Sequence, residues 1–453
     1  MMRLIGFVLT LIIFTSAAAQ ENSPYSRYGL GDLTPNQNII NRGMGGISAG
    51  YSDYQSVNFV NPASYGNLSY LSPATVRQNP GAQRNTIFDF GMEADTRTLK
   101  SINPTGKFST TNLNISYVQL GMPVKLKKAN KKGIFLGIDL GLRPVARVNY
   151  KILTLQRKGN GVNDSLATLY EGSGGLSEAM FGAGLRIKNF NIGFNSGYRF
   201  GNKTYSTKLT FINDTVTYYQ SNKSSQANYG GMFFTVGTQY EIYLKNKAFL
   251  RLGAYTSLSQ KLRGSQDVLN QTVNYDESGT PYRIDSVYQS KKGGTVQLPS
   301  TWGAGFSYQD SSSHWTFGAD YEQTNWDGYR YFDSADRVQN TWKIRGGVEY
   351  FPASSSTPIK KYFNFVKYRA GFYYGPDYIN LGNKVPEYGV TFGASFPLKL
   401  RKSSYYETQV SYMNTAIEIG SRGNKQSSLR ESIVRISVGF SLGDLWFNRS
   451  KYY

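Results

Sequence analysis

From about residue 84 to the C-terminus, hydrophobic and polar residues alternate along most of the chain. In one clear segment Phe190, Ile192 and Phe194 occupy one set of positions, and Asn191 and Gly193 lie between them. A period of two indicates β-strands with two different faces. Because one face is apolar and the other is polar or glycine, the pattern is typical of strands between lipid and a polar lumen. It predicts an all-β, antiparallel transmembrane β-barrel.

Counting the alternating segments gives fourteen strands, an even number that returns both ends of the barrel to one side of the membrane. The predicted strands are 84–98, 109–123, 133–153, 176–188, 190–212, 215–243, 247–264, 295–310, 313–333, 337–352, 362–381, 384–400, 403–421 and 427–443.

The predicted connections alternate between short and long, which sets the orientation. Short connections such as 188–190 are expected in the periplasm, and long ones such as 153–176, 264–295 and the flexible region 213–227 outside. Part of the net charge of +21 lies in the short set, for example in Lys125–Lys132. This basic rim is either an anchor to lipid headgroups or a docking face for an acidic partner.

The N-terminus has the features of a signal peptide. Arg3 is followed by the apolar run 4–14 and by an Ala-x-Ala cleavage site at 17–19. We therefore expect a signal peptide at 1–19, a plug (hatch) at 20–83 and the barrel at 84–453, exported to the bacterial outer membrane.

The segment 41–70 does not alternate, and it is rich in Gly, Asn and Ser. Its position ahead of the strands predicts a plug folded into the barrel lumen. Its motif residues are Arg42, Gly43, Gly45, Gly46, Asn61, Pro62 and Ala63. Glycines in such a segment are expected in turns that a side chain would disturb.

These motif residues, together with Leu298–Gly303 and Trp326, resemble the FadL family of outer-membrane transporters. The resemblance implies a Bacteroidetes-like member of that family, with a lumenal hatch and passive uptake of small hydrophobic molecules. It also implies a kinked third strand that opens sideways into the membrane.

Within the strand 133–153, Pro144 cannot donate a ladder hydrogen bond, so it predicts a bulge or a local gap. The lateral-gate candidates are Gly141, Arg143, Pro144 and Arg147. We expect Arg143 and Arg147 to point inward, where they meet an anionic head group in passing. The alternative is a static bulge without a role in transport.

Other charged residues occupy the polar set and are predicted to face the lumen. They are Arg186, Arg199, Arg251, Arg345, Arg369, Arg435, Asp320 and Glu349. They either pair with one another and with the plug, or bind an anionic head group.

The composition argues against an enzyme. The chain has no Cys and a single His, His314, in a predicted turn, so neither a catalytic constellation nor a metal-ligand spacing is present. No cofactor and no nucleic acid are expected. The expected partners are outer-membrane lipid and lipopolysaccharide.

Two functions remain open from the sequence. The first is passive uptake of a small hydrophobic or amphipathic ligand. The second is a non-transporting barrel subunit of an envelope machine for protein secretion or barrel assembly, with an envelope protein as partner. The polar and aromatic loop 264–295 fits exposed recognition better than a funnel for a greasy ligand.

Overall fold

A computed structural model describes residues 23–70, 85–102, 105–157, 165–212, 219–275, 281–353, 361–382, 385–398, 411–424, 427 and 429–444. The predicted signal peptide and the end of the predicted plug at 71–83 lie outside these residues. So does most of the first half of the predicted strand 403–421.

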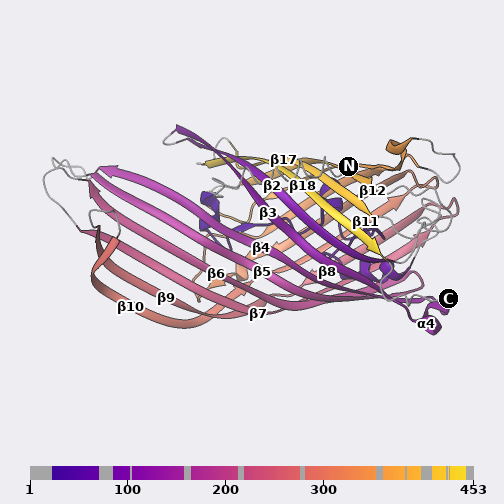
Figure 1. Cartoon of the computed structure of the whole chain (residues 1–453), viewed down its shortest axis with the longest axis horizontal. Coiled ribbons are helices and arrows are strands. Elements are labelled where there is room, and N and C mark those ends of the chain that lie inside the picture. The colour runs from indigo at the N-terminus through magenta and orange to yellow at the C-terminus, as the bar shows by residue number, and fades with distance from the viewer. Residues whose placement is uncertain are drawn as a thin grey trace, which may run out of the picture.

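The chain forms one antiparallel barrel (Figure 1). Its wall consists of β2 (Thr86–Ile102), β3 (Thr105–Val124), β4 (Ile134–Arg157), β5 (Ser165–Ile187), β6 (Phe190–Ile212), β7 (Gln220–Tyr243), β8 (Phe249–Ser257), β9 (Gln260–Tyr275), β10 (Pro281–Leu298), β11 (Ser300–Gln309), β12 (Trp315–Asn325), β14 (Thr341–Tyr350), β15 (Lys367–Pro376), β16 (Pro386–Pro397), β17 (Tyr412–Arg422) and β18 (Leu429–Asp444).

The barrel is closed and fourteen-stranded, as the alternation predicted. Closure comes from the pairing of β18 with β2. Two wall strands are each interrupted once: β8 and β9 succeed one another along β7, and β10 continues into β11 across Pro299. The short strand β13 (Arg330–Tyr331) follows the 3-10 helix η3 (Trp326–Gly328) and pairs with β10.

The outward register agrees with the apolar set of the alternation. Val434 and Ile436 on β18 are 42% and 49% exposed, whereas the intervening Arg435 is buried. Exposed apolar side chains therefore cover the outside of the wall, and polar side chains line its inside.

Several of the long loops predicted from the sequence are wrong. The regions 153–176, 213–227 and 264–295 are largely strand, because β4, β5, β7, β9 and β10 continue to 157, from 165, from 220, to 275 and from 281. In Figure 1 these strands extend well past β11 and β12, at the end opposite the short helix α4 (Lys127–Lys131). Alternation fades there because both faces of the sheet lie beyond the apolar belt, while the backbone ladder between neighbouring strands persists.

Residues 23–70 fill the interior of this barrel. They contain the 3-10 helices η1 (Pro24–Arg27) and η2 (Pro62–Ser69), the two-residue strand β1 (Asp32–Leu33) and the short helix α2 (Ile39–Gly43). Most of their side chains are buried. The segment contacts both halves of the wall: η2 packs on β4, β5 and β6, and α2 packs on β16 and β17.

Candidate functional site: the occupied lumen and the seam between β3 and β4

Asn61 of the Asn-Pro-Ala triplet forms hydrogen bonds both within the plug and to the barrel wall. Its side chain caps η2 by accepting a hydrogen bond from the Ala63 amide at 3.2 Å. Its Nδ2 donates to the carbonyl of Ala49 at 2.7 Å and to Thr238 on β7 at 3.2 Å. Proline at the first helical position needs no amide donor, so the triplet starts the helix at no cost in hydrogen bonds.

Glycines let the plug touch the wall. Gly45 has φ +70°, and a Cβ there would lie 2.5 Å from the carbonyl oxygens of Gly346 and Phe372. On the wall, a Cβ at Gly193 would lie 2.3 Å from the Pro62 carbonyl oxygen. The lumenal glycines therefore make room for the plug backbone.

Glu93 on β2 lies in an ion-pair network that joins the plug to the wall. Its carboxylate lies 2.5 Å from Arg42 of the plug, 3.0 Å from Arg147 on β4 and 3.8 Å from Arg435 on β18. Arg435 also pairs with Glu418 at 3.0 Å. Arg42 thus connects the plug to a wall carboxylate that is itself almost fully buried.

A second connection runs through Asp32 of β1. This carboxylate lies 2.5 Å from Arg97 and 3.1 Å from Arg422. Burial alone would raise the pKa of Asp32, but the two guanidinium groups lower it to about 2. Burial likewise opposes ionisation of Asp53, and Lys367, 3.1 Å away, keeps its pKa below the ordinary value.

The structure places every lumenal charge predicted from the sequence against a partner. Arg186 and Arg251 share Glu241, each at 2.7 Å. The remaining contacts are Arg199 to Glu178 at 2.8 Å, Arg345 to Glu322 at 2.9 Å, Arg369 to Glu349 at 2.7 Å, and the Asp320 carboxylate to the Ser48 and Ala49 amides at 2.5 and 2.8 Å.

Between these networks lies a cavity of about 290 Å³. Its lining includes Arg143 and Arg199, which both pair with Glu178, and the rings of Phe59 and Phe233, over which these two guanidinium groups lie. This volume is at the lower limit of small-molecule pockets, which hold roughly 300–1,000 Å³. It has room for a small amphipathic molecule.

The wall has a seam between β3 and β4. Their ladder runs only from Val124 and Leu136 to Val118 and Leu142. Beyond that point β3 pairs with β2 and β4 pairs with β5, and no β3–β4 pairing follows among the described residues. The gap that Pro144 predicted is thus present, with a bulge between Pro144 and Ala146.

The N-terminal segment occupies the β4 edge of this seam. Leu33 pairs with Ala146, and Asp32 pairs with Arg147. The Thr34 amide donates to the Val145 carbonyl at 3.1 Å, and the Ser23 amide donates to Asn149 at 3.3 Å. The chain's own first described residues therefore satisfy backbone groups that a fully paired β3 would otherwise satisfy.

The bulge changes the placement of the gate candidates. Gly141 and Arg143 face inward, and Arg143 pairs with Glu178 at 2.6 Å. Beyond the bulge Ala146 and Val148 take the buried positions, so Arg147 does not share the face of Arg143, contrary to the expectation. Arg147 instead lies at the seam, where it reaches Glu93 and donates to the Ile115 carbonyl of β3 at 3.2 Å.

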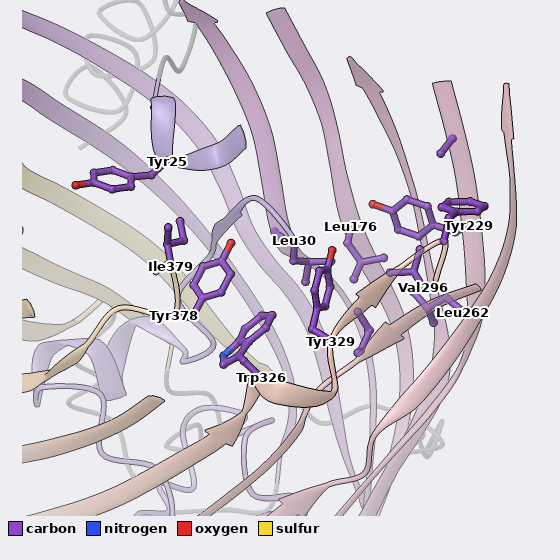
Figure 2. Close-up of a cluster of buried hydrophobic side chains, with 14 of the residues drawn as sticks. Tyr25, Leu30, Leu176, Tyr229, Leu262, Val296, Trp326, Tyr329, Tyr378 and Ile379 are labelled. Atoms are coloured by element: carbon purple, nitrogen blue, oxygen red, sulfur yellow. The ribbon is translucent and has the colours of Figure 1, made fainter. Parts of the chain in front are cut away.

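Towards the projecting strands the lumen is filled by apolar and aromatic side chains (Figure 2). Trp326 stacks on Tyr378 with ring centroids 4.3 Å apart. Tyr25 and Leu30 of the N-terminal segment join them, and Leu176 and Tyr229 come from the wall. We call this set the aromatic cluster, and the layer around Glu93 and Asp32 the ion-pair layer.

Sequence reasoning did not identify the acidic partners Glu93, Glu178, Glu241 and Asp32 as site residues. The first three stand at inward positions of their strands, so the alternation contained that signal. Asp32 lies outside the alternating region, and only the fold brings it to the seam.

Other kinds of site are not found in the described part of the chain. The described residues include no group of three or more His, Asp or Glu side chains that could hold a metal ion. No helix among them is long and apolar enough to cross a membrane.

Solved structures share this architecture at low identity. The Pseudomonas putida toluene transporter TodX matches with 16% identity and a TM-score of 0.53, over 92% of this chain and 99% of TodX. The Ralstonia pickettii toluene transporter TbuX gives 14% and 0.50, over 92% and 99%. A Pseudomonas aeruginosa FadL homologue gives 10% and 0.51, over 92% and 98%. No curated protein matches the sequence.

The chain therefore has the closed, fourteen-stranded barrel fold that these transporters also have. Its family is shown by a second finding. The family model described as BamG matches residues 1–453, the whole sequence, and the chain belongs to the BamG family.

Proposed function

We propose that this protein is a barrel subunit of the β-barrel assembly machinery, the second function considered from the sequence. The family model described as BamG covers the whole chain, and we take the Bam of that name to stand for the β-barrel assembly machinery. The geometric observation that supports the proposal is the occupied lumen, in which plug and wall are joined by buried ion pairs.

The lumen supports a scaffold because opening it is costly. Withdrawing the plug would remove one of the three arginines around Glu93, and it would remove the carboxylate that Arg97 and Arg422 share. Removing one partner of a buried ion pair costs roughly 3–5 kcal/mol. A protein that acts through its rims and loops has no need to open this interior.

In this proposal the segment 20–83 is a structural plug, and residues 1–19 are a signal peptide removed on export. The charges predicted to face the lumen have structural roles within the paired networks. The basic turn at α4 faces the periplasm and serves as a rim for lipid headgroups or for an acidic envelope protein.

Uptake of a hydrophobic ligand is the second candidate, and a specific observation favours it. The seam at Pro144 adjoins the lumen, and the fold is that of the hydrocarbon channels. In this reading a ligand crosses the 290 Å³ cavity and leaves sideways between β3 and β4. Gly141, Arg143, Pro144 and Arg147 would then form the exit.

Co-purification separates the two functions. The full chain is isolated in mild detergent, after which its protein partners and its extracted small molecules are both identified by mass spectrometry. We expect stoichiometric recovery of a barrel-assembly protein and no enriched apolar compound. An enriched hydrophobic compound with no envelope partner would contradict the assembly role and support uptake.

A wall variant tests the second candidate separately. Replacing the proline in Pro144→Val restores an amide that can donate a ladder hydrogen bond. If the protein transports, this variant lowers uptake of a hydrophobic substrate while the yield of folded barrel is kept. Unchanged uptake with unchanged folded yield would remove the lateral gate.

A further inference from the structure

The wall has a groove of about 770 Å³ that begins beside Pro144 and runs across β4, β5, β6, β7 and β9. We call it the outer groove. Its residues include Arg147 on β4, Gly175 on β5, Asn202 on β6, Asn228 on β7 and Arg263 on β9. Neighbouring strands bring them into adjacent rows, since Gly175 pairs with Asn202, Asn202 with Asn228, and Gly230 with Arg263.

The alternate residues of β6 that face outward show that the groove lies at the end of the lipid-facing belt. The exposed outward-facing residues of β6 are Phe190, Ile192, Phe194, Tyr198 and Phe200. Asn202 is the next residue on the same face. Eleven residues at about 3.3 Å each, on a strand tilted about 45°, span roughly 25 Å, the height of an outer-membrane apolar band. The groove therefore begins where the acyl chains end, at the end away from α4.

The groove is cationic. Arg263 is exposed at one side, and Arg147, whose guanidinium group also pairs with Glu93 at 3.0 Å, is part-exposed at the other. The described lining contains no Asp or Glu, and no carboxylate pairs with Arg263 among the described residues. The amides of Asn202 and Asn228 lie between the two arginines. Planar guanidinium groups and amides together match the oxygens of a phosphate.

Small residues keep the groove open. Gly174 and Gly175 have φ of +125° and +156°, a conformation that residues with a side chain rarely adopt. A Cβ at Gly230 would lie 2.7 Å from the Tyr198 hydroxyl. Tyr198 and Phe200 form the lower rim on the apolar side, as aromatic residues do at a membrane interface.

We propose that the outer groove binds the phosphorylated sugar headgroup of an outer-leaflet glycolipid. The volume exceeds what a single phosphate ion fills, and it lies within the range of sites for sugar-sized ligands. The aromatic rim continues into the lipid-facing belt, so acyl chains attached to the headgroup would lie against β6 and β7. Free inorganic phosphate has the same binding chemistry without the acyl chains.

Binding of bis-phosphorylated lipid A to the full chain in detergent micelles tests the proposal, with affinities measured by native mass spectrometry. Arg263→Gln removes one cation from the groove. A basic residue beside an anionic lipid surface contributes about 1 kcal/mol, or roughly fivefold in affinity. The matched control is Lys292→Gln, a basic residue on the projecting part of β10, which should bind as the parent does.

A second variant and a second probe complete the test. Gly230→Val keeps both arginines but fills the groove, and it should also lower affinity because the headgroup loses room. Heat-modifiable gel migration shows that each variant is folded. Equal binding by Arg263→Gln and its parent would overturn the proposal, as would equal binding of dephosphorylated lipid A. Competition by inorganic phosphate at the lipid's own concentration would show that the groove takes free phosphate instead.

Discussion

The lumen of this barrel is filled in two different ways at its two levels. The ion-pair layer joins plug and wall through Glu93, Arg42 and Asp32, with contacts of 2.5 to 3.8 Å. The aromatic cluster around Trp326 and Tyr378 closes the projecting end by apolar packing. The first depends on charges that are costly to leave unpaired, and the second on area removed from water.

The two levels have different roles: the ion-pair layer positions the plug, and the aromatic cluster seals the lumen. Buried charges demand specific partners, so the ion-pair layer sets one position of the plug. Apolar contacts are less directional, so the aromatic cluster tolerates shifts of the loops that carry Trp326 and Tyr378. Loss of the first layer should therefore have the larger effect.

The largest effect is expected from Glu93→Gln. The change leaves Arg42, Arg147 and Arg435 without a shared carboxylate in a buried site. The free energy of unfolding should fall by about 5 kcal/mol, the upper end for a broken buried pair. Urea unfolding of the barrel measures this loss. Glu171→Gln on the half-exposed end of β5 is the control and should cost about 0–1 kcal/mol.

Trp326→Ala should have the next largest effect, because it removes the ring stacked on Tyr378. We expect a loss of about 3–4 kcal/mol, in the lower part of the range for truncated core aromatics. The plug should stay in place, so proteolysis of residues 23–70 should not increase. A plug released by this variant would show that the aromatic cluster, not the ion-pair layer, positions the plug.

Ile436→Arg places a charge outside the wall and spares both levels of the lumen. Because Ile436 is 49% exposed on the lipid-facing set, the cost should be about 2–4 kcal/mol near the membrane midplane. Reconstitution into lipid vesicles followed by denaturant unfolding measures it. A neutral result would mean that β18 is shifted in register by one residue.

The smallest effect concerns pH. The pKa of Asp32 is about 2 in the folded chain and 3.8 for an ordinary Asp, so its ion pairs stabilise the seam above about pH 4. This contribution is lost as the pH falls from about 4 to 2. Hydrogen exchange of residues 23–34 should rise in that range, and Asp32→Asn should remove this pH dependence. The same pH profile in both proteins would exclude Asp32 as the source.

The two levels also differ in how far the sequence predicted them. The strand count, the inward arginines and the plug motif followed from a period of two and from Gly and Asn-Pro signals. The inward register of β2 and β5 also contained Glu93 and Glu178, although they were not identified as site residues. The wall side of the ion-pair layer is therefore encoded in local alternation, whereas its plug members Arg42 and Asp32 are not.

The aromatic cluster could not be predicted in this way. Trp326, Tyr329 and Tyr378 lie outside the regular wall strands, and Ala146 and Val148 reach the interior only because the bulge reverses the faces of β4. Pairing of β1 with β4 joins residues more than a hundred positions apart. The projecting ends of β9 and β10 were not predicted, because strands surrounded by water need no apolar face and therefore show no alternation.

A reversible disulfide between the N-terminal segment and β4 tests the central claim that the lumen stays occupied while the protein works. Leu33 and Ala146 are directly paired, and paired residues have Cα atoms about 4.5–5.5 Å apart, within reach of a disulfide. The chain has no other cysteine, so Leu33→Cys with Ala146→Cys forms one defined bond. We predict that the oxidised protein supports outer-membrane barrel assembly as well as the reduced one does. Loss of activity on oxidation and its return on reduction would contradict the account and show that the N-terminal segment must leave β4.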